Sequence, residues 1–136
     1  MNYFSKYKLI VFDLDNTLIS EKDYLFGAYE EISNQIESNC LVDKLKIENF
    51  LKDEFINNGR TKLFDKMINR FNISKIEIKV ILNVLRSYTP LTKITLIENM
   101  KLILQKLKDE KIPYVIFTNG NVDQQKNKVA NIKWEG

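Results

Sequence analysis

Two short apolar runs without polar interruption lie far apart in the chain, at residues 9–12 and 114–117. Such a run is typical of a strand that is covered on both faces in a parallel sheet. Each run ends at polar residues that are poor strand formers, Asp in the first case and Thr-Asn-Gly in the second. The pattern therefore predicts two buried strands, over residues 8–13 and 114–118.

Apolar residues between these runs recur at helical spacing. Three of the helices that we expect there cover residues 23–38, 43–56 and 60–72, the second with Asp43 as its cap. A fourth opens at a capping box formed by Ser74 and Glu77. It ends before Pro90, because the residue before a proline is pushed out of the helical conformation.

Two more helices are expected on either side of the second strand. One opens at a capping box formed by Thr95 and Glu98, and the other covers residues 122–131. A right-handed crossover would make the two strands parallel neighbours in one sheet.

The helical block after the first strand is too long to be a crossover alone. We therefore interpret it as an inserted domain. The prediction is an α/β protein whose core domain combines residues 1–20 and 89–136, with an all-helical domain at residues 21–88.

Polar side chains follow both predicted strands. Asp13 and Asp15 come after the first strand, and Thr118 and Asn119 come after the second. The carboxyl ends of parallel strands meet at one edge, where open α/β sheets bind their ligands. Each motif alone is also typical of an ordinary turn, so the prediction of a site depends on their combination.

The chemistry that these residues offer is phosphoryl transfer. The Asp13 carboxylate can attack phosphorus, and Asp15 can move protons. The Thr118 hydroxyl and the amides that follow it can bind phosphate oxygens. A divalent cation has to bridge the two anions, and Mg²⁺ suits the oxygen ligands of Asp13 and Asp15.

Composition narrows the alternatives. The chain of 136 residues has no histidine, which excludes histidine-based triads and histidine-ligated zinc. Its four glycines form neither a dinucleotide fingerprint nor a P-loop. The net charge of +3 is spread thinly, so we expect no nucleic-acid partner. Without an apolar run long enough for a bilayer or a signal peptide, we expect a cytoplasmic protein with no membrane partner.

Two motifs carry a family resemblance. Phe-Asp-Leu-Asp-Asn-Thr-Leu at residues 12–18 resembles the first motif of the haloacid dehalogenase (HAD) superfamily. Ile-Phe-Thr-Asn-Gly at residues 116–120 looks like its second motif, and the helical insert is similar to a C1-type cap. The resemblance implies a partial Rossmann-like core and a phosphatase that acts on a small phosphorylated metabolite.

The resemblance also implies roles for individual residues. Asp13 would be the nucleophile and a Mg²⁺ ligand, and Asp15 would be the acid/base and would bind the metal through its backbone carbonyl. Thr118 would bind the phosphate, with Asn119 beside it. An acid at position 15 favours phosphoester chemistry over dehalogenation.

Two further family motifs, a downstream lysine or arginine and an acidic pair, have no counterpart. Lys126, Lys128 and Lys133 come too early in the chain for the first of them. We therefore expect the N-terminal portion of a larger phosphatase, truncated after the second motif and with little or no activity as this chain. The alternatives are a phosphomutase, or a non-catalytic binding module that self-associates through the open edge of the first strand. The sequence does not reveal the substrate.

Overall fold

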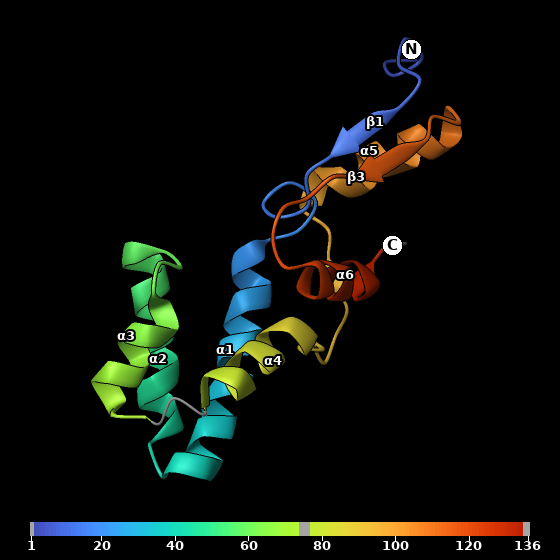
Figure 1. Cartoon of the computed structure of the whole chain (residues 1–136). Helices are drawn as coiled ribbons and strands as arrows, with labels where there is room; N and C mark the ends of the chain where they lie inside the picture. Colours follow the sequence, from blue (N-terminus) through green and yellow to red (C-terminus); the bar gives the residue numbers. More distant parts are fainter. Residues whose placement is uncertain (1, 74–76, 135–136) are drawn as a thin grey trace. The chain divides into compact units, whose positions relative to one another are not determined.

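The computed structural model describes residues 2–73 and 77–134. The chain divides into two compact units, coloured along the sequence in Figure 1. The core unit combines Met1–Tyr24 with Thr89–Gly136, and the helical unit is Leu25–Tyr88. The assignment of the helical unit as a cap stays a prediction. Within the described residues, no helix is long and apolar enough to cross a membrane.

The elements are β1 (Ile10–Phe12), α1 (Glu21–Cys40), α2 (Lys44–Asn58), α3 (Leu63–Phe71), α4 (Glu77–Ser87), β2 (Ile94–Thr95), α5 (Glu98–Asp109), β3 (Tyr114–Ile116), α6 (Val122–Ala130) and β4 (Ile132–Lys133). The four described strands all lie in the core unit, together with α5 and α6.

The two predicted strands form one parallel pair. Ile10 lies opposite Tyr114, and Phe12 lies opposite Ile116. The backbone N–H of Phe117 donates to the Phe12 carbonyl at 2.8 Å, so the pairing continues just beyond the two strands. The prediction of parallel neighbours is confirmed, although both strands are shorter than the predicted ranges.

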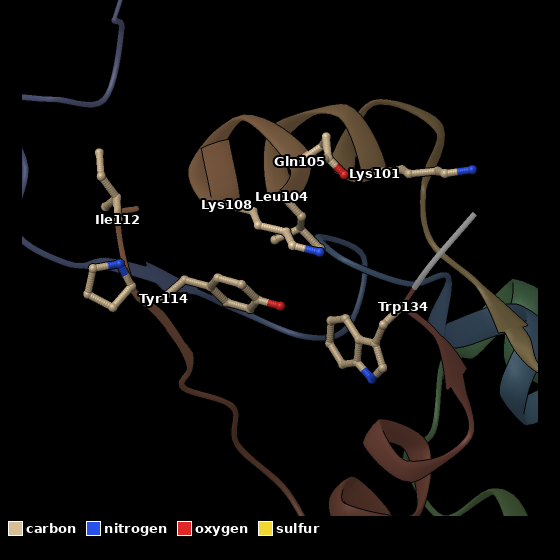
Figure 2. A pocket seen from close by; sticks show the side chains of 8 residues that line it. Lys101, Leu104, Gln105, Lys108, Ile112, Tyr114 and Trp134 are labelled. Atoms are coloured by element: carbon tan, nitrogen blue, oxygen red, sulfur yellow. The ribbon is translucent and has the colours of Figure 1, made fainter. Parts of the chain in front are cut away.

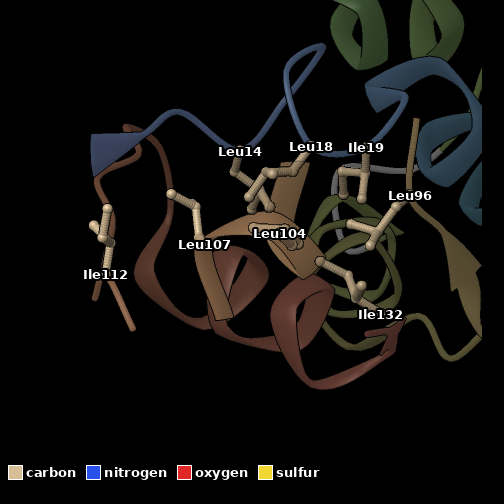
Figure 3. Packing of buried hydrophobic residues seen from close by; sticks show 8 residues of the cluster. All are labelled: Leu14, Leu18, Ile19, Leu96, Leu104, Leu107, Ile112 and Ile132. Atoms are coloured by element: carbon tan, nitrogen blue, oxygen red, sulfur yellow. The ribbon is translucent and has the colours of Figure 1, made fainter. Parts of the chain in front are cut away.

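Only one face of this pair is covered in the described residues, so the prediction of strands buried on both faces is wrong there. Ile10 and Phe12 pack against a cluster that includes Leu104 and Leu107 of α5. Successive strand residues point to opposite faces, and Val11 on the other face is 57% exposed. Figure 3 shows the buried residues of the cluster, which are Leu14, Leu18, Ile19, Leu96, Leu104, Leu107, Ile112 and Ile132.

The capping box predicted at Thr95 and Glu98 is also wrong. Thr95 lies in β2, which pairs in parallel with β4, and the residue at the cap position of α5 is Ile97. The Ile97 N–H donates to the Leu18 carbonyl at 2.8 Å, which ties the start of α5 to the loop after β1. Strands of two residues are too short to show a period, so the sequence pattern does not reveal β2 or β4. Ser74, in the other predicted box, lies outside the described residues.

The helical unit buries the stripe predicted along α1, whereas the buried residues of α2 are Ile47 and Leu51 and the predicted stripe residue Leu45 is exposed. The Asp43 carboxylate accepts from the Leu45 N–H at 2.8 Å, which confirms the predicted cap of α2. Tyr29 is 1% exposed and contacts the rings of Phe26, Phe55 and Phe64. The stripe predicted along α1 is buried as expected, at Leu25, Ala28, Tyr29, Ile32 and Ile36.

Candidate active site

The loop after β1 is held in place by its own apolar side chains. Leu14 and Leu18 are fully buried, and the Leu14 carbonyl accepts from the Leu18 N–H at 2.9 Å. Asn16 has a left-handed backbone (φ 59°), a conformation that Asn tolerates better than most residues. The buried leucines therefore anchor a tight loop that carries Asp13 and Asp15 on either side of Leu14.

Asp13 lies at the carboxyl end of β1 and is exposed. Its Oδ1 accepts from the Leu14 N–H at 2.7 Å, which restricts the rotation of the carboxylate. An exposed carboxylate with one oxygen held by the backbone is accessible to a ligand from solution. The position fits the nucleophile that the sequence predicts.

Asp15 is held through both carboxylate oxygens. Lys128 Nζ lies 2.8 Å from Asp15 Oδ1, and Gln125 Nε2 donates to Asp15 Oδ2 at 3.0 Å. The Lys128 side chain is 1% exposed, whereas the Asp15 side chain is 20% exposed. Because a buried lysine is rare unless it is paired, this ion pair is a specific feature of the site.

Gln125 also reaches the segment after β3. Its Nε2 donates to Thr118 Oγ1 at 2.8 Å and to the Asn119 carbonyl at 3.1 Å. One side chain therefore joins the two motifs that follow the two strands. The structure places Asp15, Thr118 and Asn119 around this amide, at the edge of the sheet where the sequence predicts the site.

Helix α6 presents Gln125 and Lys128 on one face, because residues three apart in a helix are neighbours. Asn121 caps this helix, and its side chain accepts from the Gln124 N–H at 3.0 Å. On the other side of the lysine, Nζ lies 5.2 Å from the centre of the Tyr24 ring. A cation between a carboxylate and an aromatic face gains from both contacts.

Sequence reasoning missed Gln125 and treated Lys128 only as too early to serve as the family's downstream lysine. The ion pair joins residues 15 and 128, and contacts of such separation leave no local pattern. One feature could have pointed to Gln125 and Lys128. The helix directly after the second motif has more polar than apolar residues on its buried face. Such a face needs polar partners.

The metal-binding capacity of the site is small. Within residues 2–73 and 77–134, no three Asp, Glu, Cys or His side chains gather into a group that could hold a metal ion. Both Asp15 oxygens accept from α6, so Asp13 is the carboxylate with room for a cation. One carboxylate and a backbone carbonyl fit Mg²⁺, which keeps several waters and shares the oxygens of a bound phosphate.

A pocket of about 640 Å³ lies away from these carboxylates. Figure 2 shows its lining, which includes Lys108, Tyr114 and Trp134. Tyr114 begins β3, so this pocket lies at the amino end of the strand, opposite to the end that carries Thr118. A second pocket, of about 690 Å³, reaches Thr118 and Gln125 and is lined mainly by apolar side chains.

The described core is thus an α/β fold, with carboxylates after one strand of a parallel pair and a threonine after the other. The family model of the haloacid dehalogenase-like hydrolases matches residues 7–133. The match covers almost the whole chain, and the chain therefore belongs to the haloacid dehalogenase-like hydrolases. No curated protein matches it significantly.

Proposed function

We propose that this protein hydrolyses the phosphate monoester of a small metabolite through an aspartyl-phosphate at Asp13. The observation that supports this most directly is the amide of Gln125. It joins Asp15, the proposed proton carrier, to Thr118, the proposed phosphate-binding hydroxyl, and Asp13, two residues before Asp15, is exposed. The helical unit is proposed as the cap that selects the substrate.

In the first step, a carboxylate oxygen of Asp13 attacks phosphorus and forms the O–P bond of the aspartyl-phosphate. The bond between phosphorus and the leaving oxygen breaks. The leaving oxygen takes a proton from Asp15 when it is too basic to depart as an anion. The Thr118 hydroxyl and the amides after it bind the non-bridging oxygens.

In the second step, a water attacks the phosphorus of the aspartyl-phosphate. Asp15 accepts a proton from that water, and the bond between phosphorus and the Asp13 oxygen breaks. The products are inorganic phosphate and the free Asp13 carboxylate. The Asp13 carboxylate and the Asp15 backbone carbonyl would hold Mg²⁺, which supplies positive charge to offset the repulsion between carboxylate and phosphate.

The test is Mg²⁺-dependent hydrolysis of p-nitrophenyl phosphate by the wild type and by Asp13→Asn. We expect slow turnover, because among the described residues Asp13 is the one carboxylate of the site with room for a cation, and a metal ion with so few protein ligands is held loosely. The protein is therefore used at high concentration, and phosphate release is followed as well as p-nitrophenolate. Asp13→Asn keeps the shape of the side chain but removes the nucleophilic charge, so its rate should equal the rate without protein.

Equal rates for the wild type and Asp13→Asn would contradict the proposal. A rate that is unchanged by chelation of Mg²⁺ would contradict the assignment of the metal. A phosphomutase would use the same residues, and it would transfer the phosphoryl group to an added alcohol in preference to water. Phosphorus NMR of the products separates these two reactions.

A further inference from the structure

We propose that Gln125 and Lys128 are positioning residues that hold the Asp15 carboxylate for the second step, the attack of water on the aspartyl-phosphate. The inference rests on the proposed function. It assigns a role to α6, a helix that lies outside the two sequence motifs. The argument depends on the donors and acceptors around Asp15 and on the burial of Lys128.

The orientation of the Gln125 amide follows from its neighbours. A carboxylate oxygen of Asp15 and the carbonyl of Asn119 can only accept hydrogen bonds, so the group that faces them has to be the NH₂ of Gln125. The same nitrogen lies 2.8 Å from Thr118 Oγ1, which therefore accepts as well. The Thr118 hydroxyl donates to the Asn119 carbonyl over a long 3.5 Å contact, and an oxygen of a bound phosphate would replace this weak acceptor.

Lys128 fixes the other oxygen of Asp15. Its side chain is 1% exposed, and its ammonium lies between Asp15 Oδ1 and the ring of Tyr24. Tyr24 is itself 2% exposed, and its hydroxyl accepts from Asn127 Nδ2 at 3.1 Å. A buried cation with a carboxylate on one side and a buried ring on the other has little freedom to move. Asp15 is therefore anchored to a rigid helix.

Both oxygens of Asp15 accept hydrogen bonds from α6, one from Lys128 and the other from Gln125. These contacts fix the orientation of the side chain that would accept a proton from the attacking water. The same contacts leave little room for a metal at the Asp15 side chain. Asp15 would thus serve the metal through its backbone carbonyl and the reaction through its side chain.

The experiment separates the two chemical steps with p-nitrophenyl phosphate. The p-nitrophenolate leaves without a proton, so its release in a single turnover reports the attack by Asp13. Phosphate release reports the hydrolysis of the aspartyl-phosphate. Lys128→Met should slow phosphate release by about tenfold or more, since positioned acid–base groups contribute on the order of a hundredfold or more. It should leave the release of p-nitrophenolate nearly unchanged.

Lys126→Met is the matched control, because it removes the same charge from an exposed position on the same helix. It should change neither rate. In the Asp15→Asn background, Lys128→Met should add no further slowing. Equal slowing of both steps by Lys128→Met, or an additive loss in the Asp15→Asn background, would overturn the inference, because either result describes a merely structural lysine.

Gln125 is tested in the same way. Gln125→Glu replaces the donor by a carboxylate that faces the Asp15 oxygen, so it should slow phosphate release more than Gln125→Ala does. Gln124→Ala is the control, because Gln124 is equally buried on α6. Unchanged phosphate release in Gln125→Glu, or equal losses in Gln124→Ala and Gln125→Ala, would contradict a role for the Gln125 amide.

The two proposals fail in different ways. If Asp13→Asn matches the wild type, the proposed function fails and the positioning role fails with it. Thermal unfolding then shows whether the ion pair between Asp15 and Lys128 only stabilises the fold. If it does, Lys128→Met should lower the melting temperature less in the Asp15→Asn background than in the wild type. If Asp13→Asn is inactive and Lys128→Met resembles Lys126→Met, the proposed function stands and the positioning role alone is wrong.

Discussion

The core unit and the helical unit bury different kinds of side chain. Among the described residues, the buried polar side chains of the core unit include Gln125 and Lys128, whose shared partner Asp15 lies more than a hundred residues away in sequence. In the helical unit, the described residues include the buried polar side chain of Ser33, whose hydroxyl donates to the Tyr29 carbonyl of its own helix at 2.7 Å. Long-range polar contacts mark the unit that carries the candidate site, and an apolar interior marks the helical unit.

A second difference concerns exposed apolar surface. The uncovered face of the β1–β3 pair carries Val11, Val115 and Phe117, which are 57%, 46% and 79% exposed. The stripe along α1 is buried within the helical unit, with Tyr29 and Ile32 at 1% and 0% exposure. The helical unit therefore buries its main apolar stripe within itself. The strand pair has an exposed apolar face, and such faces are typical of interaction surfaces.

The strongest test of the apolar interior is Tyr29→Ala. The ring is buried among Phe26, Phe55 and Phe64, so its removal leaves a cavity that aromatic neighbours cannot fill. We expect the free energy of unfolding to fall by about 3–5 kcal/mol, the usual cost of truncating a large buried ring. Urea unfolding followed by circular dichroism measures this loss.

Tyr7→Ala is the control for Tyr29→Ala, because the Tyr7 side chain is 47% exposed. Its removal should change the free energy of unfolding by no more than about 0.5 kcal/mol. A loss for Tyr29→Ala as small as the loss for Tyr7→Ala would show that the helical unit does not depend on its aromatic interior.

The uncovered strand face gives the second prediction. We propose that a second copy of the chain pairs with the open edge of β1 and so extends this face, since β1 pairs with β3 alone in the described residues and an unpaired strand edge recruits other chains. Static light scattering should show a mass that rises with protein concentration. Val11→Lys places a charge on the face and should keep the protein monomeric, with a stability change within about 0.5 kcal/mol.

Leu45→Lys is the matched control for Val11→Lys, because Leu45 is an apolar side chain of the helical unit with 58% exposure. It should not change the association. If the wild-type protein remains monomeric at all concentrations, the proposal that a second copy of the chain binds here is wrong. The non-catalytic interaction module, the alternative to an enzyme, would then lose its main support.

Much of the fold follows from local patterns. Helical spacing places the buried stripe of α1, and the Asp43 cap marks the start of α2. The apolar runs predict β1 and β3, and the crossover rule predicts their parallel pairing. The apolar run of β1 does not reveal that one face of the strand pair is uncovered. The sequence pattern is the same for an apolar residue that a neighbour covers and for one that is exposed.

The site is predictable only in part, for a similar reason. Asp15 and Thr118 are expected together because each follows a strand, and the strands are neighbours. Lys128 is not expected beside them, because lysines are common on exposed helix faces and the sequence does not show which face turns inward. The partner that decides its burial, Asp15, lies in a distant part of the chain.

The smallest effect concerns Tyr88, the last residue of the helical unit. Tyr88 packs closely against Gly27, since a Cβ at Gly27 would clash with the Tyr88 hydroxyl oxygen. Burial raises the pKa of the Tyr88 phenol, and the nearby carboxylates of Glu30 and Glu31 raise it further. The phenolate is thus less favourable in the folded protein than in the unfolded chain.

The sign of the pH dependence follows from this raised pKa. The phenol contributes its full stability below the unfolded pKa of about 10, and the contribution is lost as the pH rises through the higher folded value. Tyr88→Phe cannot ionise, so its stability should fall less steeply above that pH than the stability of the wild type. Urea unfolding at several alkaline pH values, with Tyr7→Phe as the control, measures the difference between the slopes. An equal slope for Tyr88→Phe and the wild type would mean that ionisation of Tyr88 carries no stability, and that the apolar interior of the helical unit does not extend to this residue.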